Sequence, residues 1–148
     1  MADTGRWYAC AFKSAFNKEI DFAGADAIKV ALFTSSYTPN QNTDQYYDAL
    51  SNEVANGGGY TTGGKLLAGC DLSIAALVLK LTSTDLTTAW GPGATISDAK
   101  YAVIYDDTPG SNKPLIGYAT FAAARTVVDG TLTITWDATN GLVKSTLS

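Results

Sequence analysis

Polar and apolar residues alternate strictly along the segment Thr131-Leu-Thr-Ile-Thr-Trp136. Side chains of a β-strand point alternately to opposite faces, so this pattern predicts a strand with Leu132, Ile134 and Trp136 on its buried face. Asp129-Gly130 comes directly before it and is typical of a type I′ hairpin turn, in which both central residues need φ > 0. We therefore expect one arm of a half-buried hairpin in an antiparallel sheet.

Short apolar segments recur along the chain, separated by turn residues. Strands are predicted over 26–34, 66–74, 76–81, 86–90, 99–106, 115–121, 132–136 and 142–147, with turns at 91–93, 106–110, 129–130 and 140–141. Many short strands with regular turns are typical of a sandwich or a barrel. The prediction is one mainly β domain over 1–148, an antiparallel β-sandwich or barrel-like domain (26–148) with an N-terminal α-helix or arm (1–20) and a long, partly irregular loop.

The strand expected at 26–34 carries apolar residues on both faces. Ile28, Val30 and Leu32 fall on one face, and Ala31 and Phe33 fall on the other. A strand that is apolar on both sides is covered on both sides. We expect it at the centre of the sheet.

Residues 3–20 show the spacing of a helix. Tyr8, Phe12, Phe16 and Ile20 recur every four residues, and Asp3 or Thr4 can cap the start. Such an aromatic stripe normally faces the core of its own chain. The alternative is that this N-terminal element docks on a neighbouring subunit.

The segment between the first strand and the later strands is irregular. A polar loop is expected over 35–43, a short helix over 44–50, and glycine-rich reversals at 57–59 and 63–64. A phosphate-binding loop is not supported, because Gly64-Lys65 is followed by leucine rather than by the hydroxyl residue of a Walker A motif.

Composition narrows the class of protein. Charged residues make up 16% of the 148 residues, against about 25% in typical soluble domains. This suits a protein that packs against other proteins, or equally a β-domain with threonine-rich faces. The net charge of −4 with scattered Lys and Arg argues against nucleic-acid binding. Neither a signal peptide nor an apolar segment that spans a bilayer is evident, so a cytosolic protein that does not bind membranes is expected.

Catalytic chemistry is poorly represented. The chain has no histidine, which excludes Ser-His-Asp and Cys-His centres and weakens any zinc site. Asp106-Asp107 before a Thr-Pro-Gly turn is explained by turn chemistry. Asn40, Asn42 and Asp44 alternate like calcium ligands but lack the glycine and glutamate of an EF-hand, so a solvated polar loop is favoured. We predict no enzyme, no catalytic residue, no metal site and no cofactor.

The two cysteines and two of the tryptophans are expected in the interior. Cys10 and Cys70 are interpreted as unpaired small hydrophobes, because a disulfide is disfavoured in the cytosol. Trp90 and Trp136 are assigned to the core, whereas a carbohydrate-binding domain would expose stacked aromatic rings.

Aromatic residues near the N-terminus and in the irregular middle are the candidate interface residues. Tyrosine offers a large contact area at a low cost in side-chain entropy. The candidates are Trp7, Tyr8, Tyr37, Tyr46, Tyr47 and Tyr60.

Several framework segments together resemble a known family. They are Ile28-Lys-Val-Ala-Leu-Phe-Thr-Ser-Ser-Tyr-Thr-Pro39, Tyr46-Tyr-Asp48, Asn52-Glu-Val54, Gly59-Tyr-Thr-Thr-Gly-Gly-Lys-Leu66, Ala99-Lys-Tyr-Ala-Val-Ile-Tyr-Asp106, Leu115-Ile-Gly-Tyr118 and Asp129-Gly-Thr-Leu-Thr-Ile-Thr-Trp136. With the N-terminal helix, this arrangement resembles small structural virion proteins of tailed bacteriophages, the head decoration (cement) proteins among them. These segments form strands and turns rather than a site.

The resemblance implies a non-enzymatic virion structural protein. The expected function is capsid decoration: binding to the outer surface of the head and stabilising it. The implied partners are the major capsid protein and further copies of the chain as a homotrimer, on the surface of virions assembled in the host cytoplasm. The alternatives are a phage tail or fibre-associated structural protein, or a carbohydrate-binding β-sandwich.

Overall fold

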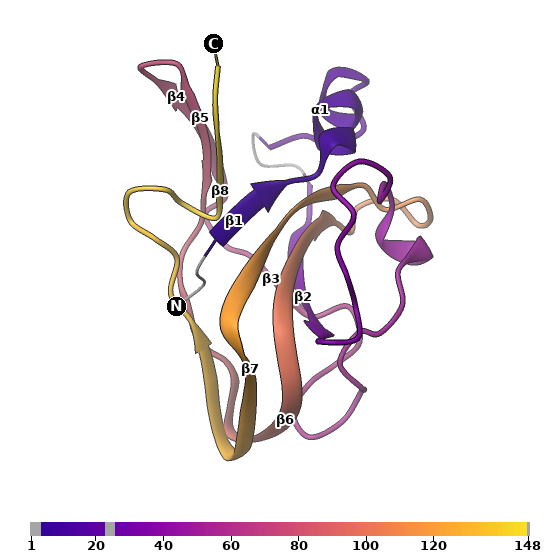
Figure 1. Ribbon diagram of the computed structural model, residues 1–148, viewed down its shortest axis with the longest axis vertical. Coiled ribbons are helices and arrows are strands. Elements are labelled where there is room, and N and C mark those ends of the chain that lie inside the picture. The colour runs from indigo at the N-terminus through magenta and orange to yellow at the C-terminus, as the bar shows by residue number, and fades with distance from the viewer. Residues whose placement is uncertain (1–3, 23–25, 148) are drawn as a thin grey trace.

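The computed structural model describes residues 4–22 and 26–147 of the chain. The elements are β1 (Thr4–Trp7), α1 (Ala9–Phe16), β2 (Ile28–Thr34), η1 (Tyr47–Ala49), β3 (Lys65–Leu66), β4 (Asp71–Ala75), β5 (Val78–Thr82), β6 (Leu86–Asp106), β7 (Leu115–Ile134) and β8 (Val143–Thr146) (Figure 1). The protein is mainly β with one short α-helix near its N-terminus, as the sequence predicted.

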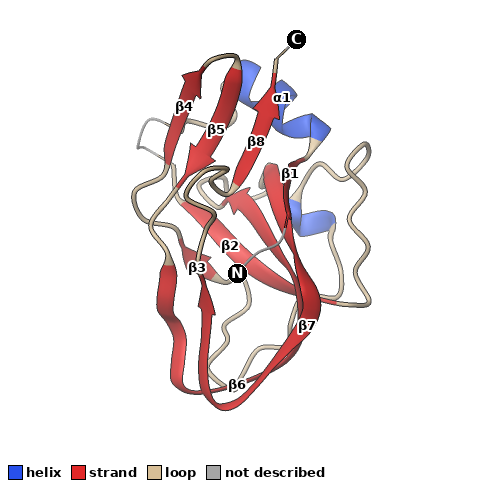
Figure 2. Ribbon diagram, turned by 60° about the vertical axis from the view of Figure 1, so that its left-hand side comes forward, coloured by secondary structure: helices blue, strands red, loops and turns tan. Residues whose placement is uncertain are grey.

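The strands form two antiparallel sheets. The larger sheet has the order β1-β7-β6-β2-β3, and the smaller sheet has the order β4-β5-β8. Figure 2 shows the smaller sheet beside the larger one, at the end of the molecule that also carries α1. The architecture is sandwich-like rather than a closed barrel.

β6 and β7 pair with each other along almost their whole length. The register runs from Leu86 opposite Ile134 to Tyr105 opposite Leu115, with several bulges between. Both strands turn back at the lower end of the molecule, so the pair forms one bent ribbon (Figure 1). The segments predicted as strands at 86–90 and 99–106 are therefore parts of β6, and those at 115–121 and 132–136 belong largely to β7.

Asp129-Gly130 lies in this bend and does not form the predicted hairpin turn. Asp129 has φ of 49°, as a turn residue should, but Gly130 pairs with Ala94 of β6. The Gly91-Pro92-Gly93 segment provides the matching bend in β6, with Gly91 and Gly93 at positive φ. Because turn residues stand at nearby positions of two paired strands, the ribbon bends as a unit. The predicted alternation is confirmed: Leu132, Ile134 and Trp136 are buried, and the threonines between them are exposed.

The N-terminal segment differs from the predicted helix. Residues 4–7 form β1, with Trp7 opposite Gly117 of β7, and only Ala9–Phe16 are helical. A Cβ atom at Gly117 would lie 2.7 Å from the carbonyl oxygen of Arg6, so glycine allows the two strands to approach closely. Tyr8 precedes the helix, which breaks the predicted stripe: Tyr8 is buried, but the Phe16 side chain is 86% exposed. Asp3, one of the two predicted caps, lies outside the described residues, and Thr4 is in β1.

Other element boundaries also shift. The helix expected at 44–50 is the single 3₁₀ turn η1, and the strand expected at 66–74 is divided into β3 and β4. β5 begins at Val78 rather than at residue 76, because Ala76 and Leu77 have φ of 49° and 64° and form the turn of the β4–β5 hairpin.

β2 is central and covered on both faces, as predicted. It lies between β6 and β3, and its side chains contribute to two hydrophobic clusters. Val30 and Leu32 belong to the main core, whereas Ala31 and Phe33 lie in a tyrosine-rich cluster on the other face. The long loop after β2 supplies Tyr37 to the second cluster. This second face of the sheet is where the polar residues of the loop converge.

Gly64 allows that loop to pass close to β2. Gly64 has φ of +72°, and a Cβ atom there would lie 1.8 Å from the carbonyl oxygen of Val30. We expect Gly64→Ala to lower the free energy of unfolding by about 3 kcal/mol, measured by urea denaturation. Gly110→Ala is the control, because nothing lies within 4 Å of its Cβ position, and a change below about 0.5 kcal/mol is expected. Equal losses in the two variants would contradict this account.

Candidate functional site

The structure places most of the predicted interface residues in the interior. Tyr8, Tyr60, Tyr37 and Trp7 expose 0%, 2%, 6% and 7% of their surface, respectively. Tyr46 and Tyr47 are half-buried. The four buried rings contact their own chain, so we do not retain them as contact residues. The loop tyrosines follow no strand pattern that would indicate burial, but the loop folds back onto the sheet.

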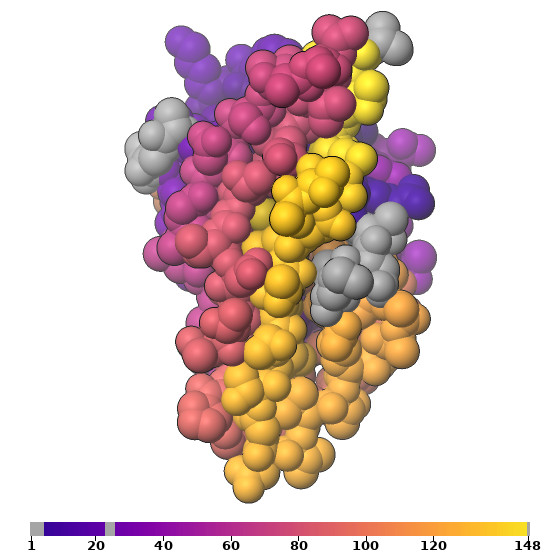
Figure 3. Space-filling model, turned by 90° about the vertical axis from the view of Figure 1, so that its left-hand side faces the viewer, coloured from indigo at the N-terminus to yellow at the C-terminus, as the bar shows by residue number. Residues whose placement is uncertain are grey.

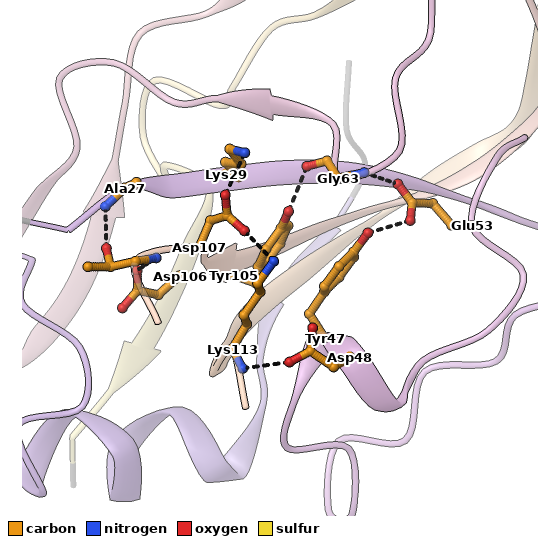
Figure 4. A network of polar contacts seen from close by, with 11 residues as sticks. Ala27, Lys29, Tyr47, Asp48, Glu53, Gly63, Tyr105, Asp106, Asp107 and Lys113 are labelled. Atoms are coloured by element: carbon orange, nitrogen blue, oxygen red, sulfur yellow. Dashed lines mark hydrogen bonds and ion pairs between the residues drawn. The ribbon is translucent and has the colours of Figure 1, made fainter. Parts of the chain in front are cut away.

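Glu53 is the centre of a hydrogen-bond network that fastens the long loop (Figure 4). The Tyr47 hydroxyl donates to Oε2 of Glu53 at 2.5 Å, and the Tyr60 hydroxyl donates to Oε1 at 2.6 Å. The backbone N–H of Gly63 also donates to Oε1, at 2.7 Å. The Tyr60 oxygen in turn accepts the backbone N–H of Leu32 in β2 at 2.9 Å. One carboxylate thereby joins three parts of the loop to the central strand.

Tyrosine ionisation is suppressed in this network. Burial, together with hydrogen bonding to Glu53 and its negative charge, raises the pKa of both Tyr47 and Tyr60. Burial also raises the pKa of Tyr105, whose ring stacks on Tyr47 at 4.1 Å between centroids. The Tyr105 hydroxyl donates to the carbonyl oxygen of Gly63 at 2.7 Å. These phenols therefore remain proton donors throughout the physiological pH range.

A second network holds the start of the loop. The hydroxyls of Tyr8 and Tyr37 are 2.7 Å apart, and Tyr37 donates to Oδ2 of Asp44 at 2.8 Å. The oxygens once considered as calcium ligands are used within the loop: Asn40 Oδ1 accepts the backbone N–H of Asn42, and Asp44 Oδ2 accepts that of Asn40. No group of three or more His, Cys, Asp and Glu side chains within 4–22 and 26–147 is placed to hold a metal ion.

Asp106 and Asp107 have opposite environments at the end of β6. Asp107 lies 2.5 Å from Nζ of Lys29 and 2.8 Å from Nζ of Lys113. Partial burial opposes its ionisation, but the two ammonium groups prevail and lower its pKa. Asp106 is fully buried, and its Oδ1 accepts the backbone N–H of Thr108, as expected for turn chemistry. Burial raises its pKa, and the nearby carboxyl group of Asp26 acts in the same direction.

The arrangement of these groups suits a clasp rather than a reaction centre. The phenols of Tyr47 and Tyr60 donate to Glu53, which also accepts the backbone N–H of Gly63, so these hydrogen bonds hold loop segments in fixed positions. The hydrogen bond from the backbone N–H of Lys113 to Asp48 extends the same network to η1 (Figure 4). The polar chemistry of this face is therefore used for rigidity.

Exposed aliphatic and aromatic side chains are the feature that sequence reasoning missed. Those with large exposed fractions are Phe16 (86%), Val128 (74%), Leu77 (63%), Ile74 (61%), Leu66 (57%) and Leu147 (44%). Three of them, Ile74, Leu77 and Leu147, belong to the β4–β5 hairpin and the end of the chain after β8. Figure 3 shows this side, with the hairpin (pink) and the C-terminal strand (yellow) reaching the same end of the molecule. The run 74–79 is apolar throughout, but its sequence alone does not show whether these side chains are buried or exposed.

The two tryptophans lie in the core as predicted, and the cysteines are unpaired as predicted but only half-buried rather than interior. Trp90 is fully buried, Trp136 is 7% exposed, and Tyr60 stacks on Trp90 with 6.1 Å between ring centroids. Phe16 is the only aromatic residue among the largely exposed apolar side chains of the described segments. Cys10 and Cys70 are free and half-buried, and burial raises the pKa of Cys70.

No protein-family model, no curated protein and no solved structure matches the chain. Within the described segments, none of the helices has the length and apolar character needed to cross a membrane.

Removing the Tyr60 hydroxyl tests the clasp. Tyr60→Phe takes a donor from Glu53 and leaves the buried N–H of Leu32 without its acceptor, so we expect a loss of about 2–4 kcal/mol in the free energy of unfolding. Tyr46→Phe is the matched control, because its half-buried hydroxyl accepts only from the neighbouring Gln45 side chain. Chemical denaturation measures both variants, and losses of similar size would argue against the clasp.

The buried carboxylate of Asp106 predicts a pH-dependent gain in stability when its charge is removed. Because its pKa is raised, the folded state binds the proton of Asp106 more tightly than the unfolded state does. The protonated side chain therefore contributes its full stabilisation below the unfolded-state pKa of 3.8, and this stabilisation is lost as the pH rises through the folded-state pKa. Asp106→Asn keeps an acceptor for Thr108 and carries no charge. We expect it to gain about 1–3 kcal/mol at pH 7, with the gain vanishing near pH 3, measured by thermal unfolding.

Asp107→Asn provides the opposite case. The lowered pKa of Asp107 gives stability that is present above the unfolded value and is lost as the pH falls through the folded pKa. This variant should therefore be less stable than the parent chain at pH 7, and the difference should disappear in acid. A gain for Asp107→Asn or a loss for Asp106→Asn at pH 7 would refute the assignments.

Proposed function

We propose that this chain is a non-enzymatic structural protein of a bacteriophage virion, which binds the outer surface of the capsid and stabilises the head. Its partners in this proposal are the major capsid protein and further copies of itself, and its location is the surface of the virion. The proposal joins a surface feature of the fold to the resemblance carried by the framework segments.

The observation that carries the proposal is the distribution of exposed apolar side chains. They lie on α1 (Phe16), on the edge strand β3 (Leu66), at the β6–β7 bend (Val128) and on the β4–β5 hairpin (Ile74, Leu77). Large apolar groups left in water cost free energy that burial in an interface recovers. Contacts in several directions suit a protein that lies between neighbours on an assembled surface.

The rigidity of the domain supports the same role. The Glu53 and Asp44 networks hold the long loop on the sheet, so little conformational entropy remains to be lost on binding. A pre-ordered domain that makes several modest contacts gains retention through multivalency, without a single strong interface. A decoration protein that clamps adjacent capsid subunits needs this combination.

The resemblance of the framework segments adds the expected assembly. Decoration proteins of this kind commonly bind as trimers at three-fold positions. The N-terminal segment, one of the contact surfaces expected from the sequence, is partly integrated into the sheet as β1. Deleting it would remove a strand, so a substitution on the exposed side of α1 is the sharper test of a contact.

Capsid binding is tested by sedimenting the purified chain with empty capsids of the phage that encodes it. We expect saturation at hundreds of copies per capsid, and at least about tenfold weaker binding for Phe16→Ser, because an exposed phenylalanine contributes about 1.5–3 kcal/mol when buried. Lys13→Ser is the control, since it removes an exposed polar side chain from the same helix.

The copy number separates this proposal from its nearest alternative. A few copies at one end of labelled virions would indicate a tail or fibre-associated protein. Failure to bind capsids, with the protein folded, would reject capsid decoration.

A further inference from the structure

β4 is an open edge of the smaller sheet. It is the first strand in the order β4-β5-β8, and within residues 4–22 and 26–147 only β5 pairs with it. Its register with β5 is uninterrupted from Asp71 opposite Thr82 to Ala75 opposite Val78. β4 is therefore a regular strand with one unpaired side.

The hairpin geometry fixes which backbone groups face that open side. Because the turn has two residues, Ala76 and Leu77, the flanking pair Ala75 and Val78 is hydrogen-bonded. Alternation along the strand then directs Ser73 toward β5, and it directs the N–H and C=O groups of Leu72 and Ile74 outward. These outward groups form a template for a further strand.

β4 lacks the features that normally protect an edge. Its central residues Leu72-Ser-Ile-Ala75 contain no charge, no proline and no bulge. The other sheet edges are less suited to pairing with a further strand. β3 has only two residues, one of them Lys65. The lower part of β7 is irregular, with a register shift between Thr120 and Arg125. β8 is flanked by β1, whose Gly5 lies against the backbone of Leu142.

Apolar side chains are exposed at the turn end of the smaller sheet, on β4, in the turn and after β8. Ile74 is opposite Leu79, and Leu147 donates its N–H to the carbonyl oxygen of Leu77 at 2.7 Å. This register places Ile74, Leu77 and Leu147 on the face that carries the fully buried Leu81, but beyond the core. Their exposed fractions are 61%, 63% and 44%, respectively, so three large apolar groups stand in water at one end of the sheet.

The turn between β4 and β5 holds a leucine, Leu77, at positive φ and exposed to solvent. Leucine at positive φ costs about 1–2 kcal/mol, and Leu77 is also 63% exposed, so burial within its own chain does not offset that cost.

We infer that β4 pairs antiparallel with β4 of a second copy of the chain, about a two-fold axis at Ser73. In this register Leu72 and Ile74, whose backbone groups point outward, pair with the partner's Ile74 and the partner's Leu72. Their side chains form apolar cross-strand pairs. Asp71 lies opposite the partner's Ala75, so no like charges face each other. The two small sheets become one six-stranded sheet across the axis.

Electrostatics favours this end for contact between copies. Each copy carries a net charge of −4, so two copies repel each other over most approaches. Residues 72–79 have no charged side chain, and the three residues after Lys144 have none either. Asp71 is the charged residue of β4, and the register places it opposite the partner's uncharged Ala75, so the pairing brings no like charges directly opposite each other.

The contact is independent of the proposed capsid binding and compatible with it. Neighbouring three-fold positions on an icosahedral lattice are related by two-fold axes, so β4–β4 pairing would join one trimer to the next. The same pairing in solution gives a dimer, or an even multiple of one chain.

Light scattering over a concentration series tests the inference. The parent chain should show the mass of an even-numbered oligomer, and Ile74→Lys should halve that mass by weakening the association at least about tenfold. Val128→Lys is the control: it replaces an equally exposed aliphatic residue of another strand, and it should leave the mass unchanged. Both positions are largely exposed, so both variants should fold.

Amide hydrogen exchange identifies the pairing itself. The N–H groups of Leu72 and Ile74 should be protected in the parent oligomer and exchange rapidly in the Ile74→Lys variant. A monomer at all concentrations, or an oligomer whose mass and exchange are unaffected by Ile74→Lys, would overturn the inference. Capsid sedimentation of Ile74→Lys distinguishes this inference from the proposed function. A variant that no longer self-associates but still binds capsids bears only on β4 pairing and leaves the proposed capsid binding unaffected.

Discussion

The pairing of β6 with β7 is the interaction on which the rest of the structure depends. It runs from Leu86 and Ile134 to Tyr105 and Leu115, and β1 and β2 add to its two sides. The chain before Leu86 forms β5, and the chain after Ile134 leads to β8. Because Leu86 and Ile134 are paired, both strands continue from the same end of the ribbon and pair with each other in the smaller sheet. One continuous pair of strands thus sets both the order of the larger sheet and the position of the smaller one.

The second constraint is that both faces of the larger sheet are covered by different means. The main core covers one face, whereas the long loop covers the other through rings and hydroxyls, with Glu53 accepting donors from Tyr47, Tyr60 and Gly63. A loop of this length pays a large entropic cost when it is ordered, and charge-assisted hydrogen bonds in a buried setting offset part of that cost. At the far end of the smaller sheet, Ile74 and Leu77 are largely exposed.

The sequence predicts three features that follow from a local two-residue period: the strand content, the central position of β2 and the buried face of residues 132–136. What could not be predicted is long-range. Asp129-Gly130 is compatible with either a hairpin turn or a bend within a strand. It forms a bend because the paired strand β6 also bends nearby, at Gly91–Gly93. Likewise, Tyr60 and Tyr37 have no periodic neighbours that reveal a buried environment, and Phe16 satisfied a helical stripe whose first member, Tyr8, lies outside the helix. The exposed edge of β4 depends on which strands do not pair with it, and local pattern cannot show this.

The Glu53 network also has an evolutionary consequence. Loss of any one donor takes a hydrogen bond from this half-buried carboxylate, so changes at Glu53, Tyr47 and Tyr60 are coupled to one another. Homologues are expected to keep all three or to replace them together with apolar residues of similar volume. The exposed threonines of β7 are free of that linkage and can diverge one at a time, so the loop that looks least ordered in the sequence should be among the slowest parts of the chain to change.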